Sequence, residues 1–416
     1  MQKKVVVIGG GIVGLSCAYY LQKAGHQVTV IDKGDFSTGT SHINAGYLTP
    51  SHIVPLAAPG MVKKGLKWMF RPDSPFYIQP RLDPNLLRWG WKFMRASNQN
   101  HVDKSLKVIR DINLFSKDLY FELKNSDAFD FQLESKGLLM AYQSSKAEKE
   151  EAWVVNQARN LGLEVTQLDP GQLNKLQPEA QMNVAGAFYY KCDAHATPSL
   201  FMKQLLEQCQ KMGVECRSNT TLTGVAHDQQ KISMLYTSEG SIEAEEYVMA
   251  AGTWSQDLLR PLGVRIALEA GKGYEIHTKE DTGIQLPAIL LEPKIAVTPM
   301  QGFTRFAGTM ELSGINHKIV PRRVAAIAKG VHAFYLNINL SQKHLSDARC
   351  GLRPLSPDGL PYIGKHPNCK NLTLATGHAM MGWSLGPATG KLVEEVLSNK
   401  KTSLPLAPFL PTRKTG

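Results

Sequence analysis

Cysteine is scarce in this chain of 416 residues, and its six cysteines are scattered along it. No two of them form a Cys-x-x-Cys pair, and none lies beside a histidine at the spacing of zinc ligands. The pattern argues against a structural zinc site, and we predict no metal. Scattered thiols without partners are typical of a reducing compartment, which favours a cytoplasmic protein.

Long apolar runs are also lacking. One run, from Val5 to Leu21, follows two lysines as in a signal peptide, but glycines interrupt it and no small-residue cleavage site follows. No other stretch reaches the length of a transmembrane helix. We therefore expect a cytoplasmic protein without membrane-spanning segments.

Runs of like charge are absent as well. The 47 Lys and Arg residues outnumber the 36 Asp and Glu residues, for a formal net charge of +11, but the basic residues are scattered. Because no nucleic-acid-binding motif accompanies them, we predict no nucleic-acid partner. The excess of positive charge favours an anionic cofactor, an acidic substrate or a membrane surface.

The N-terminal residues predict a βαβ unit. Val5 to Ile8 is a β-branched run typical of a buried parallel strand, Leu15 to Ala24 is helix-like, and Val28 to Ile31 predicts a second strand. The turn at 9–14 reads Gly-Gly-Gly-Ile-Val-Gly, which matches G-x-G-x-x-G between a strand and a helix. The unit therefore predicts a dinucleotide site.

Each position of this motif has a physical role. Gly9 permits the tight turn, Gly11 lets the backbone approach a pyrophosphate, and Gly14 lets the helix pack against the sheet. The helix N-terminus, at Ile12 and Val13, offers free N–H groups to the phosphates. Asp32, with Lys33 beside it, ends the second strand, where a carboxylate accepts hydrogen bonds from the ribose hydroxyls.

Three later segments are also rich in glycine and small residues. Residues 40–47 read Thr-Ser-His-Ile-Asn-Ala-Gly-Tyr, and residues 248–255 read Val-Met-Ala-Ala-Gly-Thr-Trp-Ser. Gly-Leu-Arg-Pro at 351–354 leads to Pro-Asp-Gly-Leu-Pro-Tyr-Ile-Gly at 357–364, Ala-Thr-Gly-His at 375–378 and Gly-Trp at 382–383. This order resembles the D-amino-acid oxidase superfamily, and within it the bacterial D-amino-acid dehydrogenases and glycine oxidases. The resemblance implies FAD, which the first motif does not distinguish from NAD.

The resemblance also implies which residues contact the flavin. The first segment would pass beside the flavin ring and supply Thr40, Ser41, Asn44, Ala45 and Gly46. The second would supply Ala251 and Gly252, and the stretch from Gly377 to Gly382, with Trp383, would pass under the pyrimidine end. A helix beginning near Trp383 would direct its N-terminus at flavin N1 and the C2 carbonyl, where negative charge develops on reduction.

The family pattern further implies substrate-binding residues. The arginine of the G-x-R-P element, Arg353, would pair with the substrate carboxylate, for which a guanidinium offers a rigid two-pronged fit. Arg305 is the second choice. Tyr274 is the candidate hydroxyl, although a packing role is equally open, and His378 or His42 would tune the flavin or bond the substrate unless it is structural.

The predicted fold is α/β, with a Rossmann-like FAD-binding domain and a second α+β substrate domain built on an antiparallel sheet. We assign residues 1–55, 147–265 and 345–416 to the FAD-binding domain, and 56–146 and 266–344 to the substrate domain. Residues 214–226, 232–238 and 241–248 alternate like antiparallel strands, 86–94 look helical, and 382–398 predict the final helix.

The predicted function is FAD-dependent oxidation of a small amino acid, most of all a D-amino acid. In the family, hydride passes from Cα to flavin N5, and the imino acid gives a 2-oxo acid and ammonia. Oxidation of glycine, sarcosine or D-hydroxyproline on the same scaffold is the enzymatic alternative. A non-catalytic flavin-binding protein of the membrane surface and an NAD-dependent dehydrogenase are the alternatives from other classes.

The stretch from Pro55 to Arg95 mixes aromatic and basic residues. Trp68, Phe70 and Trp91 occur among Lys63, Lys64, Arg88 and Arg95, among others. Such a mixture suits a peripheral membrane contact, which would fit electron transfer to a membrane quinone, although an ordinary amphipathic helix pair is an alternative. The sequence leaves oxygen and quinone open as acceptors.

Overall fold

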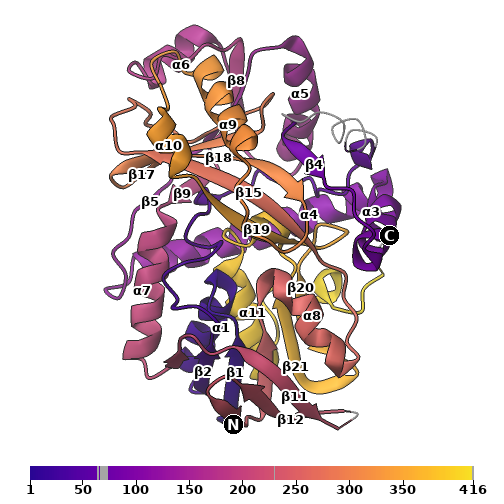
Figure 1. The fold of residues 1–416 in the computed structure, drawn as a ribbon. Helices are drawn as coiled ribbons and strands as arrows, with labels where there is room; N and C mark the ends of the chain where they lie inside the picture. Colours follow the sequence, from indigo (N-terminus) through magenta and orange to yellow (C-terminus); the bar gives the residue numbers. More distant parts are fainter. Residues whose placement is uncertain (63–64, 66–73, 229, 415–416) are drawn as a thin grey trace.

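The computed structural model describes residues 1–62, 65, 74–228 and 230–414. Figure 1 shows two stacked halves: a lower one around β1 and β2, and an upper one around β15, β17 and β18. Parallel strands with covering helices lie in one half and a large mixed sheet in the other, which confirms the predicted α/β fold with a second, sheet-based part.

The lower half is built on a sheet of six strands within the described residues. Its order is β10 (Glu215–Arg217), β2 (Gln27–Ile31), β1 (Lys4–Ile8), β14 (Glu246–Met249), β21 (Cys369–Thr376) and β20 (Tyr362–His366). The first five run parallel, and β20 pairs antiparallel with β21. Val5 to Ile8 are buried on both faces of the sheet, so β1 shows no alternation of apolar and polar residues.

Helices cover this sheet. α1 (Ile12–Lys23) follows the glycine turn and packs against α11 (Gly386–Leu397), while α7 (Pro198–Lys211) and α4 (Gln99–Lys124) complete the layer. The final helix begins at Gly386 and not near Trp383 as predicted, because residues Ala379–Met381 form a separate 3₁₀ turn first.

The upper half is a sheet to which nine described strands contribute. Its order is β19 (Arg349–Leu355), β15 (Glu269–Thr278), β18 (Phe303–Leu312), β17 (Ile295–Met300), β16 (Ala288–Leu290), β6 (Leu138–Tyr142), β8 (Gly186–Tyr190) and β7 (Val165–Leu168), with β4 (Phe76–Ile78) beside β18. α9 (Pro321–Phe334) packs on one face through Val324, Ile327 and Val331. The pair β15–β19 lies at the edge nearest the lower half (Figure 1).

Two predictions about strands are wrong in part. Residues 214–226 do not form one antiparallel strand: β10 joins the parallel sheet, and the hairpin starts only at β11 (Leu222–His227). Residues 241–248 divide between the hairpin strand β13 (Gly240–Ile242) and the parallel strand β14. A short alternating run occurs in parallel and in antiparallel sheets. Strands distant in sequence, with which the run pairs, decide which of the two it joins.

The sheets also differ from the predicted partition of the chain at more than one place. β19 falls within 345–416, which we assigned to the FAD-binding domain, yet it pairs with β15 in the nine-stranded sheet. β7 and β8 fall within 147–265, which we assigned to the FAD-binding domain, yet both pair within the nine-stranded sheet. β8 pairs antiparallel with β6, which lies in this sheet, and β7 pairs with β8, so both strands follow β6. The other domain boundaries stay predictions.

Candidate active site

A cavity of about 810 Å³ opens at the carboxyl ends of β1, β2 and β14, where parallel α/β sheets bind their ligands. Fifteen predicted site residues line it: Gly9, Gly11, Ile12, Val13, Asp32, Lys33, Thr40, Ser41, Asn44, Ala251, Gly252, Arg353, His378, Gly382 and Trp383. Segments spread over almost the whole chain therefore meet at one cavity.

Four predicted cofactor residues and Tyr274 are not on the cavity wall. Gly14, Ala45, Gly46 and Gly377 are in packed backbone: an added Cβ at Gly46 would lie 2.2 Å from the Ala196 carbonyl oxygen. The carbonyl of Ala45 accepts a hydrogen bond from Thr298 Oγ1 at 2.7 Å. These residues support the segments that line the cavity, and any direct contact with a cofactor stays a prediction.

Asp32 organises the glycine turn. Its Oδ2 accepts from the Gly10 amide at 2.6 Å, and its Oδ1 accepts from the Gly34 amide at 2.7 Å. The carboxylate thus ties the end of β2 to the start of α1. Lys33 Nζ lies 3.3 Å from the ring centroid of Trp254, and burial lowers the pKa of Lys33 against the opposing effect of Asp32.

The segment at 40–46 connects the two halves of the site. Ser41 Oγ accepts from the Ile12 amide at 3.0 Å, at the N-terminus of α1. Thr40 Oγ1 donates to the Leu352 carbonyl at 3.2 Å and accepts from the Leu352 amide at 3.0 Å. The segment therefore fixes β19, and with it the neighbouring Arg353, relative to the dinucleotide turn.

Arg353 is a half-buried cation on the cavity wall. Its Nη1 donates to the Thr309 carbonyl at 3.1 Å, and no carboxylate pairs with it among the described residues. Burial lowers the pKa of Arg353 to about 10, so the guanidinium stays charged at neutral pH. A charge removed in part from water and left without a counter-ion is costly, and an anionic ligand would supply the missing partner.

Arg305, the second choice, is already occupied. Its Nε lies 3.4 Å from Glu275 Oε2, and its Nη1 donates to the carbonyls of His42 and Asn44. It does not line the cavity. The structure therefore favours a supporting role for Arg305, beneath the segment at 40–46.

The prediction that Tyr274 offers its hydroxyl to the substrate does not match its position. The side chain is 1% exposed and packs with Ile327 and Val331 on the face covered by α9. Its hydroxyl donates to Glu311 Oε2 at 2.7 Å. Successive strand residues face opposite sides, and Gly273 rather than Tyr274 faces the guanidinium of Arg353. The packing alternative fits Tyr274.

The two candidate histidines differ in position. His378 lines the cavity, is 1% exposed, and lies with Nε2 2.9 Å from Thr389 Oγ1. Burial lowers the pKa of His378 to about 3, so it is neutral and a poor proton acceptor near pH 7. His42 is not on the wall, and its Nε2 lies 2.9 Å from the Phe36 carbonyl oxygen.

Several lining residues escaped the sequence analysis. Thr220 and Thr221 follow β10, whose place in the parallel sheet was not recognised. His317 and Ile319 belong to a loop held by Lys272, whose Nζ donates to the Lys318 carbonyl at 3.0 Å. No local motif marks that loop. Thr253 and Trp254 directly follow Ala251 and Gly252 within the segment at 248–255, although we did not name them as site residues.

The described residues fit FAD. The cavity joins the glycine turn, the acidic strand end and the arginine on β19 in one volume. Thr253 Oγ1 and Trp383 Nε1, from two lining residues, are buried without a hydrogen-bond partner among the described residues, which leaves them available to a polar ligand. No group of three or more His, Cys, Asp or Glu side chains suited to a metal occurs in that part of the chain.

Comparison with known proteins agrees with this geometry. D-amino acid dehydrogenases from Paramagnetospirillum magneticum and Neisseria meningitidis are each 30% identical to the chain; the first match covers 96% of both proteins, the second 96% of the chain and 97% of the relative. A crystal structure of glycine oxidase from Geobacillus kaustophilus shares the fold, with a TM-score of 0.78 at 22% identity over 99% of both chains. The model of a family described as FAD dependent oxidoreductase matches residues 4–396. The chain therefore belongs to this family of FAD-dependent oxidoreductases.

Proposed function

We propose that the chain oxidises a small amino acid, with a D-amino acid as the main candidate. The product is an imino acid, which water hydrolyses to a 2-oxo acid and ammonia. The observation that carries the proposal is Arg353, a half-buried guanidinium on the cavity wall with no carboxylate partner among the described residues. The relatives named D-amino acid dehydrogenases, which match almost the whole chain, support the choice of substrate.

The contrast with other buried charges supports the assignment of Arg353. Glu275 lies between Arg305 and Arg349, and Glu311 lies 3.1 Å from Lys272 Nζ and 3.2 Å from Arg323 Nε. Each of these four cations therefore has a carboxylate within ion-pair distance. Arg353, unlike these four cations, has no carboxylate partner among the described residues. A substrate carboxylate can accept two parallel hydrogen bonds from its guanidinium.

The cavity wall also suits the rest of a small amino acid. When bound, FAD supplies the acceptor for the hydride that leaves Cα. Ile43, Leu352 and Ile319 make part of the wall apolar, which limits the access of water. Met380 lines the cavity with 49% of its surface exposed and offers an adaptable contact to an apolar substrate body.

His378 does not serve as the base that accepts the proton of the substrate amine. A residue with a pKa near 3 does not take up the amine proton at neutral pH. We therefore propose that the substrate reacts as the neutral amine, without His378 as a general base. Arg353 fixes the carboxylate, so that the Cα–H bond has one orientation in the cavity.

The first prediction is that D-alanine bleaches the yellow flavin absorbance of the purified protein under anaerobic conditions. Oxygen is excluded, so bleaching reports hydride transfer without the second half-reaction. Glycine, sarcosine and D-hydroxyproline form the comparison arm, and faster bleaching by one of them would move the substrate to that class. Absence of bleaching by every amine would contradict the proposal and favour a flavoprotein without amine-oxidising activity.

We further propose a peripheral membrane contact through α3 (Pro84–Ala96), with a quinone as electron acceptor. Leu87, Trp91 and Met94 recur at helical spacing and are 66%, 52% and 54% exposed, an unusual apolar face for a surface helix. Arg88 and Arg95 are exposed beside them, and Arg95 Cζ lies 4.8 Å from the Trp91 ring centroid. A basic, aromatic helix face suits an anionic bilayer.

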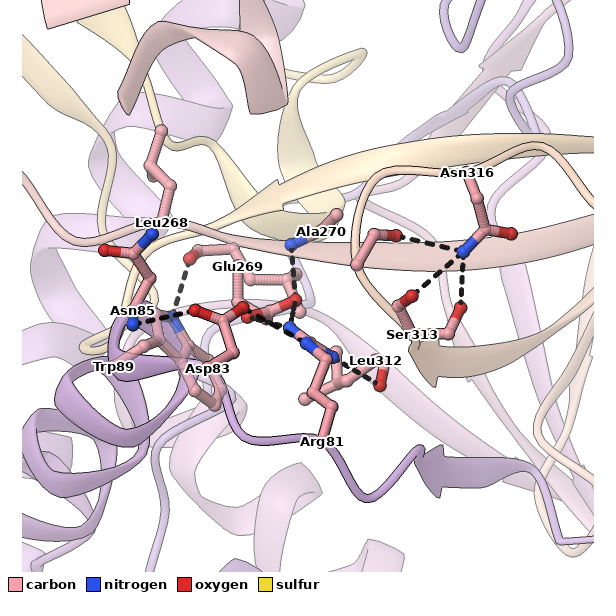
Figure 2. A network of polar contacts seen from close by, with 12 residues as sticks. Arg81, Asp83, Asn85, Trp89, Leu268, Glu269, Ala270, Leu312, Ser313 and Asn316 are labelled. Atoms are coloured by element: carbon pink, nitrogen blue, oxygen red, sulfur yellow. Dashed lines mark hydrogen bonds and ion pairs between the residues drawn. The ribbon is translucent and has the colours of Figure 1, made fainter. Parts of the chain in front are cut away.

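The attachment of α3 supports this orientation. Figure 2 shows Arg81, just before the helix, between Glu269, Asp83 and Leu312. Its Nη2 lies 2.8 Å from both Glu269 carboxylate oxygens, and Asp83 accepts from the Asn85 amide at the start of α3. Trp89 Nε1 donates to the Leu355 carbonyl at 2.8 Å. The helix is thus fixed to β19 through Trp89 on its inner face, and Arg81 fixes the segment before it to β15 and β18.

The predicted contact residues Lys63, Lys64, Trp68 and Phe70 lie outside the described residues. In the described part of the chain, no helix combines the length and the apolar character needed to cross a bilayer. The proposed contact is therefore carried by α3, and the cytoplasmic location stays a prediction.

The second prediction is that the protein sediments with vesicles made of equal parts phosphatidylglycerol and phosphatidylcholine. Each basic residue near the surface contributes about 1 kcal/mol, so high salt should release the protein. Replacing Leu87 and Trp91 together by glutamine should reduce binding without slowing anaerobic bleaching. Trp153→Gln, at a 42% exposed tryptophan on another helix, is the matched control. Failure to sediment at low salt would contradict the membrane contact.

A further inference from the structure

The guanidinium of Arg353 lies directly over a glycine of the neighbouring strand. β15 and β19 pair antiparallel, with Gly271 opposite Arg353 and Gly273 opposite Gly351. A Cβ added at Gly273 would lie 2.3 Å from Arg353 Nη1 and 2.5 Å from Nη2. The side chain of Arg353 therefore occupies the space that any other residue at position 273 would fill.

The next strand holds the other side of the guanidinium. Tyr274 pairs with Gly308 and Lys272 pairs with Glu311, so both Thr309 and Met310 lie opposite the single residue Gly273. Two residues facing one define a β-bulge, which redirects backbone groups locally. Thr309 takes a φ of +70° there, which is unfavourable for a β-branched residue, and its carbonyl accepts from Arg353 Nη1 at 3.1 Å.

We propose that Gly273 and the bulge at Thr309–Met310 form a seat that positions Arg353 for the substrate carboxylate. Because Gly273 has no side chain, the guanidinium can lie against its backbone, and the Thr309 carbonyl accepts a hydrogen bond from one nitrogen of the guanidinium. The flanking Lys272 and Tyr274 are engaged with Glu311, and so add neither charge nor bulk to the seat. Gly273 is thus a positioning residue, and its role rests on the proposed function of Arg353.

The seat predicts the effect of one added methyl group. In Gly273→Ala the guanidinium must move, so the dissociation constant of propionate should rise about tenfold or more. Propionate keeps the carboxylate of D-alanine without its amine, and its binding can be followed by the change in flavin absorbance. The ratio of FAD to protein should be unchanged, because Gly273 does not line the cavity wall. Binding as in the wild type would overturn the proposal.

The matched control adds the same methyl group on the other face of the sheet. At Gly308 a Cβ would lie 3.2 Å from Ile327 Cγ1, on α9, and not near Arg353. Gly308→Ala should therefore keep the propionate dissociation constant within about twofold of wild type, even where it lowers the melting temperature. An equal loss of propionate binding in both variants would indicate general disruption and contradict the seat.

A double-mutant cycle separates this inference from the proposed function. In an Arg353→Lys background the fork is gone, so adding Gly273→Ala should weaken propionate binding by less than about threefold. An equally large loss in both backgrounds would overturn the seat. If Arg353→Leu abolishes propionate binding while Gly273→Ala leaves it intact, only the seat fails. If Arg353→Leu binds propionate normally, the carboxylate anchor itself is wrong.

Discussion

Arg353→Leu should leave FAD bound and remove most amino-acid turnover. The substitution deletes a charge-assisted, two-pronged contact with the carboxylate, which costs roughly 2–5 kcal/mol, or a factor of about 30 to several thousand in kcat/KM. Leucine also removes a half-buried guanidinium that has no carboxylate partner among the described residues, so the fold should not suffer from a broken ion pair. The measurements are kcat/KM for D-alanine, FAD per protein and the melting temperature.

Two further substitutions show whether the fall in kcat/KM reflects a lost contact with the substrate carboxylate. Arg353→Lys should give an intermediate kcat/KM, because lysine keeps the charge but not the planar fork. Arg305→Leu should instead lower stability, since it removes a partner of the buried Glu275 and two hydrogen bonds to the segment at 40–46. An unchanged kcat/KM in Arg353→Leu would move the carboxylate anchor to another residue.

The dinucleotide part of this site was predictable because its determinants are local. The turn at 9–14, the helix after it and Asp32 lie within one βαβ unit, where spacing in sequence fixes spacing in the fold. The structure confirms the strands and the helix of this unit, and it brings Asp32 to the Gly10 amide. Resemblance to a family added the distant segments, which no local pattern would have joined.

Which of the arginines is paired with a carboxylate could not be predicted in the same way. Whether an arginine is free depends on which strand brings a glutamate to it: Glu275 reaches Arg305 because β15 pairs with β18. The same pairing contains the bulge at Thr309–Met310, which lies opposite Gly273 and depends on register. Tyr274 illustrates the error that follows. Its place beside two glycines marked the right strand, but not the face to which its side chain points.

Substitutions in the glycine turn should have two different effects: one at Gly11 should weaken FAD binding, and one at Gly14 should also destabilise the fold. At Gly11, an added Cβ meets only Ser41 Oγ, at 3.3 Å, so Gly11→Ala should fold normally. The methyl group would instead hold a pyrophosphate away from the backbone amides. Losing hydrogen bonds to a charged group costs about 1.5–3 kcal/mol, which corresponds to roughly tenfold to a hundredfold weaker FAD binding.

Gly14→Ala should damage the fold itself. Its Cβ would lie 1.8 Å from the Gly9 carbonyl oxygen, and this backbone cannot yield easily because the Gly9 amide donates to the Ile31 carbonyl at 2.9 Å. α1 would have to move away from β1, at a cost of about 1–3 kcal/mol or more for overpacking. The melting temperature of the FAD-free protein should therefore fall in Gly14→Ala and stay near wild type in Gly11→Ala. FAD per protein after dialysis should fall in both. Retention of FAD by Gly11→Ala would show that the pyrophosphate does not bind at this turn, and a wild-type melting temperature for Gly14→Ala would contradict the close packing of helix and strand.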